Sequence, residues 1–303
     1  MFIELDNHLI NKILSYRGKH PIVSQCIPMT EMSVKDVMVA RSSNRLVILK
    51  WLILLGWKMP KDEICNKAAA AGNLEILKWA RGVGCTWDAQ TCAWAAEYDH
   101  WEILKWAREN GCPWDEKTCA SAALTGHLEI LRWARENGCP WSEWTCSYAA
   151  RSGHWEILRW ARENGCPWNE WTCSFAASKG HLDILKWLRE NECPWDERTC
   201  AEASMHGSLE VVKWARLNGC PSNERTCAYA AINGDLDILK WARLNGCPWD
   251  QMTCRCAALN GHLPVLKWAI ENGCPWNQYV IIEATRYHHL HIIEWMRQHN
   301  HIN

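Results

Sequence analysis

Residues 112–138 read CPWDEKTCASAALTGHLEILRWARENG, and the pattern returns over residues 139–165 as CPWSEWTCSYAARSGHWEILRWARENG. A glycine ends each copy, and the distance from Gly111 to Gly138 gives a repeat period of 27 residues. The same glycine recurs at Gly84, Gly111, Gly138, Gly165, Gly219, Gly246 and Gly273. Self-similarity at a fixed period of about 20–50 residues is typical of stacked-repeat proteins. The sequence therefore predicts an elongated array of similar units.

Each unit encodes two short helices. Asp115 and its equivalents have short side chains that accept a hydrogen bond, as a helix N-cap requires. These positions are Asp88, Asp115, Ser142, Asn169, Asp196, Asn223, Asp250 and Asn277. A first helix is expected over 116–125 and a second over 128–137, with Gly126 ending the first and Gly138 following the second. No segment alternates with a period of two, so the predicted fold class is all-α.

The two helices carry different apolar stripes. The first helix has only small residues on its stripe, Cys119, Ala122, Ala123 and Gly126. The second has Leu128, Leu131 and Ala134, with Ile130 and Trp133 at the flanks. One unit cannot bury these faces alone, so stacking must bury them. A Trp recurs in every second helix, and its strict recurrence favours packing over a ligand site.

The pattern AAxxGHLEILKWARENG resembles the ankyrin repeat, AAxxGHxEVVxLLLExGA, over residues 36–303. The residues that carry the resemblance here are Ala122-Ala123, Gly126-His127, Glu129 and Gly138-Cys139. The unit is shorter than the usual ankyrin repeat of about 33 residues, and Thr118-Cys119-Ala120-Ser121 replaces Thr-Pro-Leu-His. The resemblance implies an ankyrin-like helical solenoid of about ten units with shortened loops that lack β-hairpin fingers. The short Trp- and Cys-rich form is similar to ankyrin-like proteins of large DNA viruses of amoebae and of some protists.

Composition argues against several classes of function. The 303-residue chain has 33 basic and 34 acidic residues and a net charge of −1. This balance gives no electrostatic footprint for nucleic acid or an anionic membrane. No secretory signal or long apolar run is visible, so we expect a cytoplasmic protein, in the host cytoplasm if viral, with the nucleus left open.

The 18 cysteines mostly obey the repeat, in pairs such as Cys112/Cys119. This recurrence favours small buried apolar residues. Disulfides between equivalent positions are disfavoured, because stacked repeats hold those positions about a helix diameter apart. A C-x6-C spacing is no recognised zinc motif, and no His completes a ligand set. We therefore expect neither metal nor cofactor.

Residues 1–35 lie outside the repeat. Their apolar residues follow helical spacing at Leu5, Leu9, Ile10, Ile13 and Leu14. The stretch LDNHLINKILSY resembles the first helix of an F-box, which implies that these residues bind the linker subunit of a cullin ubiquitin ligase. The alternative, which we favour, is a helix that caps the first repeat, because terminal caps are expected in such arrays.

Two irregularities stand out, one at the end of the array and one inside it. The last unit, 280–303, is degenerate, and its His288, His289 and His291 fit a C-terminal cap better than a metal site. Glu192 replaces the recurrent glycine. Because a non-glycine residue is disfavoured in the left-handed region, a different helix end with a local change of curvature is expected there.

The repeats also indicate where a partner could bind. Constant positions serve the stack, whereas exposed positions that vary are free for binding. On the first helix the face opposite the small residues varies strongly between units. The predicted partner-binding residues on that face are Trp94, Trp144, Tyr148, Arg151, Trp171, Phe175, Arg198, Arg225 and Tyr229. In ankyrin-like stacks this helix lines the concave side, where partners usually bind.

No phosphate-binding loop or isolated catalytic base is present, so an enzyme is not expected. Three functions remain. The first is a protein-interaction scaffold, expected to be monomeric unless it belongs to an assembly. The second is a substrate adaptor for a ubiquitin ligase, recruited through the N-terminal helix. The third is a structural component such as a virus-particle protein.

Overall fold

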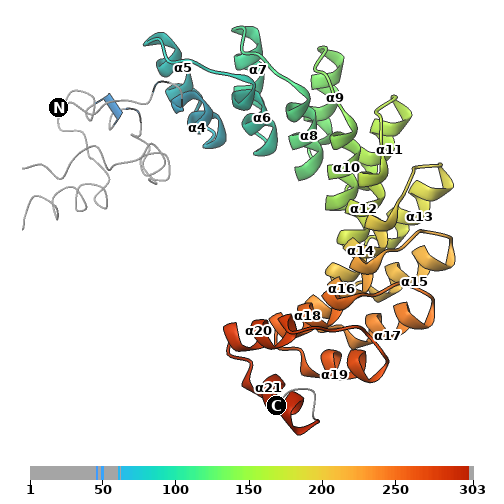
Figure 1. The fold of residues 1–303 in the computed structure, drawn as a ribbon. Helices are drawn as coiled ribbons and strands as arrows, with labels where there is room; N and C mark the ends of the chain where they lie inside the picture. Colours follow the sequence, from blue (N-terminus) through green and yellow to red (C-terminus); the bar gives the residue numbers. More distant parts are fainter. Residues whose placement is uncertain (1–45, 47–48, 51–60, 62, 300–303) are drawn as a thin grey trace, which may run out of the picture. The chain divides into compact units, whose positions relative to one another are not determined.

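Pairs of short α-helices form the whole of the regular structure in the computed structural model, which describes residues 46, 49–50, 61 and 63–299 (Figure 1). The chain divides into two compact units, Met1–Trp141 and Ser142–Asn303. The helices of the first unit are α4 (Ile64–Ala70), α5 (Leu74–Gly82), α6 (Ala89–Glu97), α7 (Trp101–Glu109), α8 (Glu116–Thr125) and α9 (Leu128–Glu136). This array confirms the predicted all-α repeat fold.

The second unit continues the alternation of first and second helices. Its first helices are α10 (Glu143–Ser152), α12 (Glu170–Ser178), α14 (Glu197–Met205), α16 (Glu224–Asn233), α18 (Gln251–Leu259) and α20 (Tyr279–Arg286). Its second helices are α11 (Trp155–Glu163), α13 (Leu182–Glu190), α15 (Leu209–Leu217), α17 (Leu236–Leu244), α19 (Leu263–Glu271) and α21 (Leu290–Gln298).

The predicted caps set the helix starts. The Asp115 side chain accepts a hydrogen bond of 3.0 Å from the Lys117 amide, and Asn169 makes the same contact, at 3.0 Å, with the Trp171 amide. Ser142 is the exception, because its side chain makes no capping bond. At the other end of α8, Gly126 takes a φ of 91° in the left-handed region, which stops the helix.

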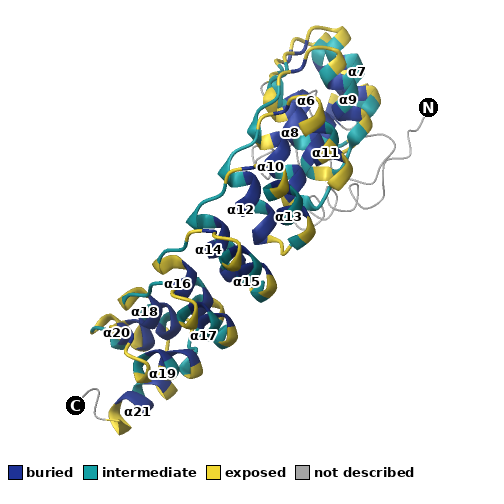
Figure 2. Ribbon diagram, turned by 90° about the vertical axis from the view of Figure 1, so that its right-hand side faces the viewer, coloured by how far each residue is buried: buried dark blue, intermediate teal, exposed yellow. Residues whose placement is uncertain are grey.

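Side-chain size decides how the helices stack. Cys, Ala, Ser and Thr fill the buried positions of the first helices, so α10, α12 and α14 pack closely side by side. The second helices carry Trp and Leu and contact one another much less. Buried residues follow the first helices in Figure 2. In α9 the buried residues are Ile130, Leu131 and Ala134, whereas Leu128, predicted for the core stripe, is only half-buried.

The recurrent Trp of the second helix is a packing residue. The Trp187 ring lies edge-on to Trp168, with centroids 5.8 Å apart, and Arg162 lies 4.0 Å above the Trp168 ring. Equivalent Trp pairs are Trp87–Trp106, Trp114–Trp133, Trp195–Trp214 and Trp249–Trp268. The same arginine also donates to the carbonyl four residues on, as Arg243 does to Cys247 at 2.6 Å. Where both residues are present, the arginine and the Trp thereby connect the second helix to the loop that follows it.

The recurrent His residues connect successive repeats. His262 donates from Nε2 to the Ile232 carbonyl at 3.0 Å, and His289 donates to the Leu259 carbonyl at 3.0 Å. His291 donates in the same way to the Gly261 carbonyl at 2.9 Å. Through these hydrogen bonds the imidazoles connect one repeat to the one before it.

Glu192 does not change the helix end, so that prediction is wrong. The Cys193 amide donates to the Leu188 carbonyl at 2.9 Å, as the equivalent amides do in other repeats. Glu192 itself adopts a φ of 63°, in the left-handed region that the glycines occupy elsewhere. The packing of the repeats fixes this turn, so the strain, about 1–2 kcal/mol, is retained at Glu192.

Candidate partner-binding surface

Four of the predicted residues form one cluster on the first helices of the second unit. We call Trp144 and Tyr148 of α10, with Trp171 and Phe175 of α12, the aromatic cluster. Tyr148 and Phe175 stack with ring planes 8° apart and centroids 6.0 Å apart. Trp144 lies 5.7 Å from Tyr148 and 6.1 Å from Phe175, and Trp171 lies 5.8 Å from Phe175. The cluster thus spans two adjacent repeats.

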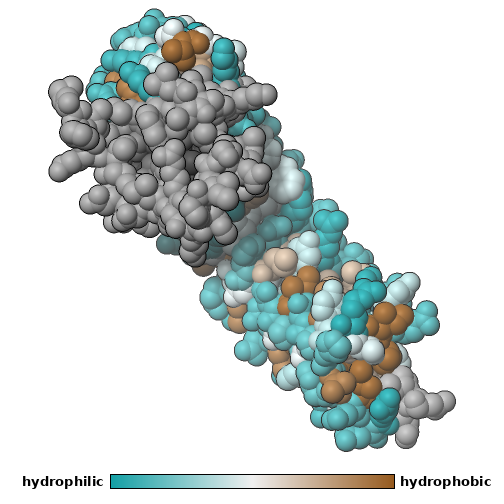
Figure 3. Space-filling view, turned by 90° about the vertical axis from the view of Figure 1, so that its left-hand side faces the viewer, coloured by the Kyte–Doolittle hydropathy of each residue, from teal (hydrophilic) through white to brown (hydrophobic). Residues whose placement is uncertain are grey.

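The rings of the cluster are only partly covered. Trp144 is 37% exposed, and the other three side chains are half-buried. Positions equivalent to Trp144 hold Lys117, Arg225 and Met252, so the fold does not require an aromatic ring there. On the face that Figure 3 shows, the described residues are mostly hydrophilic, with apolar side chains in small groups. Contiguous groups of exposed apolar side chains often mark interaction sites.

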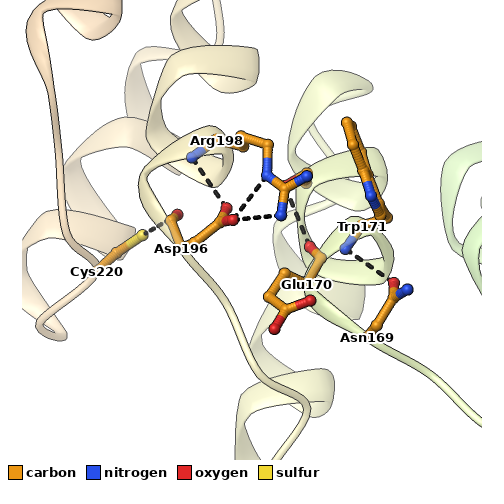
Figure 4. A network of polar contacts seen from close by, with 7 residues as sticks. Asn169, Glu170, Trp171, Asp196, Arg198 and Cys220 are labelled. Carbon is orange, nitrogen blue, oxygen red and sulfur yellow. Dashed lines mark hydrogen bonds and ion pairs between the residues drawn. The ribbon is translucent and has the colours of Figure 1, made fainter.

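Two predicted arginines border the cluster. Arg198 of α14 lies with its Cζ 4.1 Å above the Trp171 ring (Figure 4). Asp196 holds it through contacts of 2.5 Å to Nη2 and 2.6 Å to Nε, and these hydrogen bonds raise the Arg198 pKa above its usual value. Arg151 is exposed, with its Cζ 5.6 Å from the Phe175 ring. Both cations lie on aromatic faces, which is a favourable arrangement.

The remaining predicted residues lie away from the cluster. Arg225 is exposed and Tyr229 is half-buried on α16, and in the described residues no ring contact joins Tyr229 to the aromatic cluster. Trp94 belongs to the first unit, where it stacks on Tyr98 with centroids 5.9 Å apart. The F-box-like residues Leu5, Leu9, Ile10, Ile13 and Leu14 lie outside the described residues.

A second set of aromatic contacts was not predicted. Trp155, at the start of α11, packs on Trp187 of the next repeat with centroids 5.3 Å apart and is 38% exposed. Trp101 makes the same contact with Trp133 at 5.5 Å. The signal was available, because the equivalent position holds Leu128 in the repeat after Trp101 and Leu182 in the repeat after Trp155.

The cysteines in the described residues are free and buried, in agreement with a structural role. The thiols in contact are not the C-x6-C partners: the Cys92 thiol hydrogen-bonds to Cys112, and Cys139 bonds to Cys119 in the same way. Burial raises the pKa of the Cys65 thiol to about 12 and that of Cys227 to about 12. Such thiols stay protonated at neutral pH and are poor nucleophiles.

Within residues 63–299 and the few described residues before them, no three His, Cys, Asp or Glu side chains are arranged to hold a metal ion. None of the described helices is both long enough and apolar enough to cross a membrane.

Comparison with known protein families gives one match. The family of ankyrin repeats present in many copies matches residues 146–189, which begin in α10 and end in α13 and include most of the aromatic cluster. No curated protein matches the chain.

Proposed function

We propose that this chain, whose family match and array of short helix pairs fit the ankyrin-repeat family, is a scaffold that binds a protein partner on its first helices. Ankyrin repeats generally mediate protein–protein interaction and are typically non-enzymatic. The finer assignment is that the aromatic cluster anchors the partner.

One observation carries this assignment. At the positions of the aromatic cluster the repeats differ freely, whereas the buried Thr, Cys and Ala of the same helices hardly change. Stacking explains the constant residues but gives no reason for Trp at 144 and 171. Trp and Tyr are enriched among the residues that dominate binding energy at interfaces, at about 2 kcal/mol or more each. Arg151 and Arg198 add a cationic border of the type also found at such sites.

The test replaces both Trp residues of the cluster by residues that the array already accepts at the equivalent positions. The double variant Trp144→Lys with Trp171→Arg copies Lys117 and Arg198 of other repeats. Wild type and variant are used side by side for affinity capture from native cells, with mass spectrometry of the bound proteins. We expect the variant to remain helical and to lose the partner that the wild type captures.

Trp155→Leu is the matched control, because Trp155 is as exposed as Trp144 but lies on a second helix. It should keep the partner. Equal capture by wild type and the double variant would refute the assignment of the aromatic cluster, and so would unfolding of the double variant at room temperature.

A further inference from the structure

The polar groups of the aromatic cluster are almost all hydrogen-bond donors. No group in the described part of the chain accepts from the indole N–H of Trp144 or of Trp171. The Trp144 side chain is exposed and that of Trp171 is half-buried. The exposed Arg151 guanidinium adds further donors and no acceptor. The Tyr148 hydroxyl is the one group of the cluster that can also accept. A ligand that matches this surface must therefore offer acceptors and apolar faces.

We infer that the aromatic cluster binds a proline-rich segment in the polyproline II conformation; this inference rests on the proposed function. Such a segment has backbone carbonyls without internal partners, and its prolines have no N–H. Its pyrrolidine rings pack well on aromatic side chains, which is the known basis of PPII recognition by aromatic surfaces. An acidic peptide is a poorer match, because Asp196 already neutralises Arg198, and the position equivalent to Phe175 in the next repeat holds Glu202.

The repeat spacing supports the same ligand. A polyproline II helix advances about 9 Å in one turn of three residues. Closely packed helices lie about 8–10 Å apart. Trp144 and Trp171 occupy equivalent positions on adjacent first helices, so one turn of the ligand spans one repeat. Residues i and i+3 of the segment then meet the two indoles in turn.

The cluster also limits the length of the ligand. Beyond α12 the equivalent positions hold Arg198 and Glu202, and Arg198 covers one face of Trp171. The aromatic surface therefore extends over two repeats in the direction of α14, which corresponds to about two turns of the ligand. A core of about six residues, with prolines three apart, is the expected motif.

The test measures binding of a fluorescein-labelled dodecaproline peptide to the full chain by fluorescence anisotropy. A Gly-Ser dodecapeptide and an amphipathic Leu/Lys helical peptide serve as comparison ligands. We expect saturable binding of dodecaproline alone. Trp144→Phe and Trp171→Phe keep a ring but remove the donor, so each should weaken binding about fivefold. Trp155→Leu should leave the affinity unchanged.

Three results would overturn the inference. The first is no dodecaproline binding at millimolar peptide, and the second is binding unaffected by Trp144→Phe and Trp171→Phe. The third is preferential binding of the helical peptide, lost in the Trp144→Lys, Trp171→Arg variant. This third result would leave the proposed function intact, because the aromatic cluster would still bind a protein segment. If the proposed function itself is wrong, wild type and that variant will capture the same partners equally.

Discussion

Tyr148 and Phe175 occupy the same position in adjacent repeats and stack with nearly parallel rings, with their planes 8° and their centroids 6.0 Å apart. The stack arises because the small residues of α10 and α12 bring these helices close together, and the pair connects Trp144 to Trp171. The rings therefore contribute to stability while part of their surface stays exposed.

Phe175 is the centre of this group, so Phe175→Ala should lower the free energy of unfolding by about 2–3 kcal/mol. Tyr229, two repeats on, is the matched control, because within the described residues it has no ring partner. Tyr229→Ala should lower it by less. Urea unfolding followed by Trp fluorescence measures both, and equal losses would show that ring stacking contributes little.

Glu192→Gly should raise the stability by about 1 kcal/mol, because glycine adopts the left-handed conformation of this turn without strain. The converse change, Gly165→Glu, should lower the stability by a similar amount, because Gly165 has a φ of 82°. No atom lies within 4 Å of the added Cβ, so backbone strain is the only cost expected. Thermal unfolding of the two variants provides the measurement. A loss of stability in Glu192→Gly would mean that the Glu192 side chain has a contact that offsets its strain.

Gly234→Ala and Gly246→Ala should differ clearly. Both glycines have nearly the same positive φ, 77° and 78°, so each change carries the same backbone penalty of about 1 kcal/mol. At 234 the added Cβ would also lie 2.7 Å from Nδ1 of His262, whose ring is held by the Ile232 carbonyl. Gly234→Ala should therefore be the more destabilising in urea unfolding. Equal losses of unfolding free energy in the two variants would mean that the hydrogen bond to the Ile232 carbonyl does not hold the His262 ring in place.

Ser222→Trp should stabilise the array by about 0.5–1.5 kcal/mol. Ser222 stands where most repeats place a Trp that packs edge-on against the Trp of the following second helix, here Trp241. A Trp at 222 would also lie beside Arg216, as Trp249 does beside Arg243 at 4.1 Å. Thermal unfolding tests this, with Ser222→Ala as the control that adds no ring. An unchanged or lower melting temperature in Ser222→Trp would contradict the packing role of these pairs.

The buried thiols predict a loss of stability at alkaline pH. Cys65 and Cys227 have folded-state pKa values near 12, above the ordinary value of 9.0. From about pH 9 to 12 the unfolded chain releases these protons while the folded chain keeps them, so stability falls as pH rises. The slope is up to about 1.4 kcal/mol per pH unit for each thiol.

The measurement is urea unfolding with reductant at a series of pH values from 8 to about 11. Tyr and Lys also titrate in this range, so the comparison is with the Cys65→Ala, Cys227→Ala variant. Its stability should fall less steeply with pH than that of the wild type. Parallel curves would mean that these thiols ionise in the folded protein.

Local patterns in the sequence were enough to predict the secondary structure of this protein and the stacking of its repeats. Caps such as Asp115, the glycines and the spacing of Cys119, Ala122 and Ala123 act within one repeat, so they can be read locally. Variation between repeats also picked out Trp144, Tyr148, Trp171 and Phe175 as residues that stacking does not require.

The geometry with which these residues meet depends on tertiary packing. The offset of one helix against the next sets the contacts between repeats, and it stacks Tyr148 on Phe175 with ring planes 8° apart. The same offset brings Cys92 to Cys112 rather than Cys112 to Cys119. At Glu192 the packing of the neighbouring residues outweighs the local preference and holds a glycine-like turn. A local pattern cannot give these relationships, because they depend on how rigid helices pack in three dimensions.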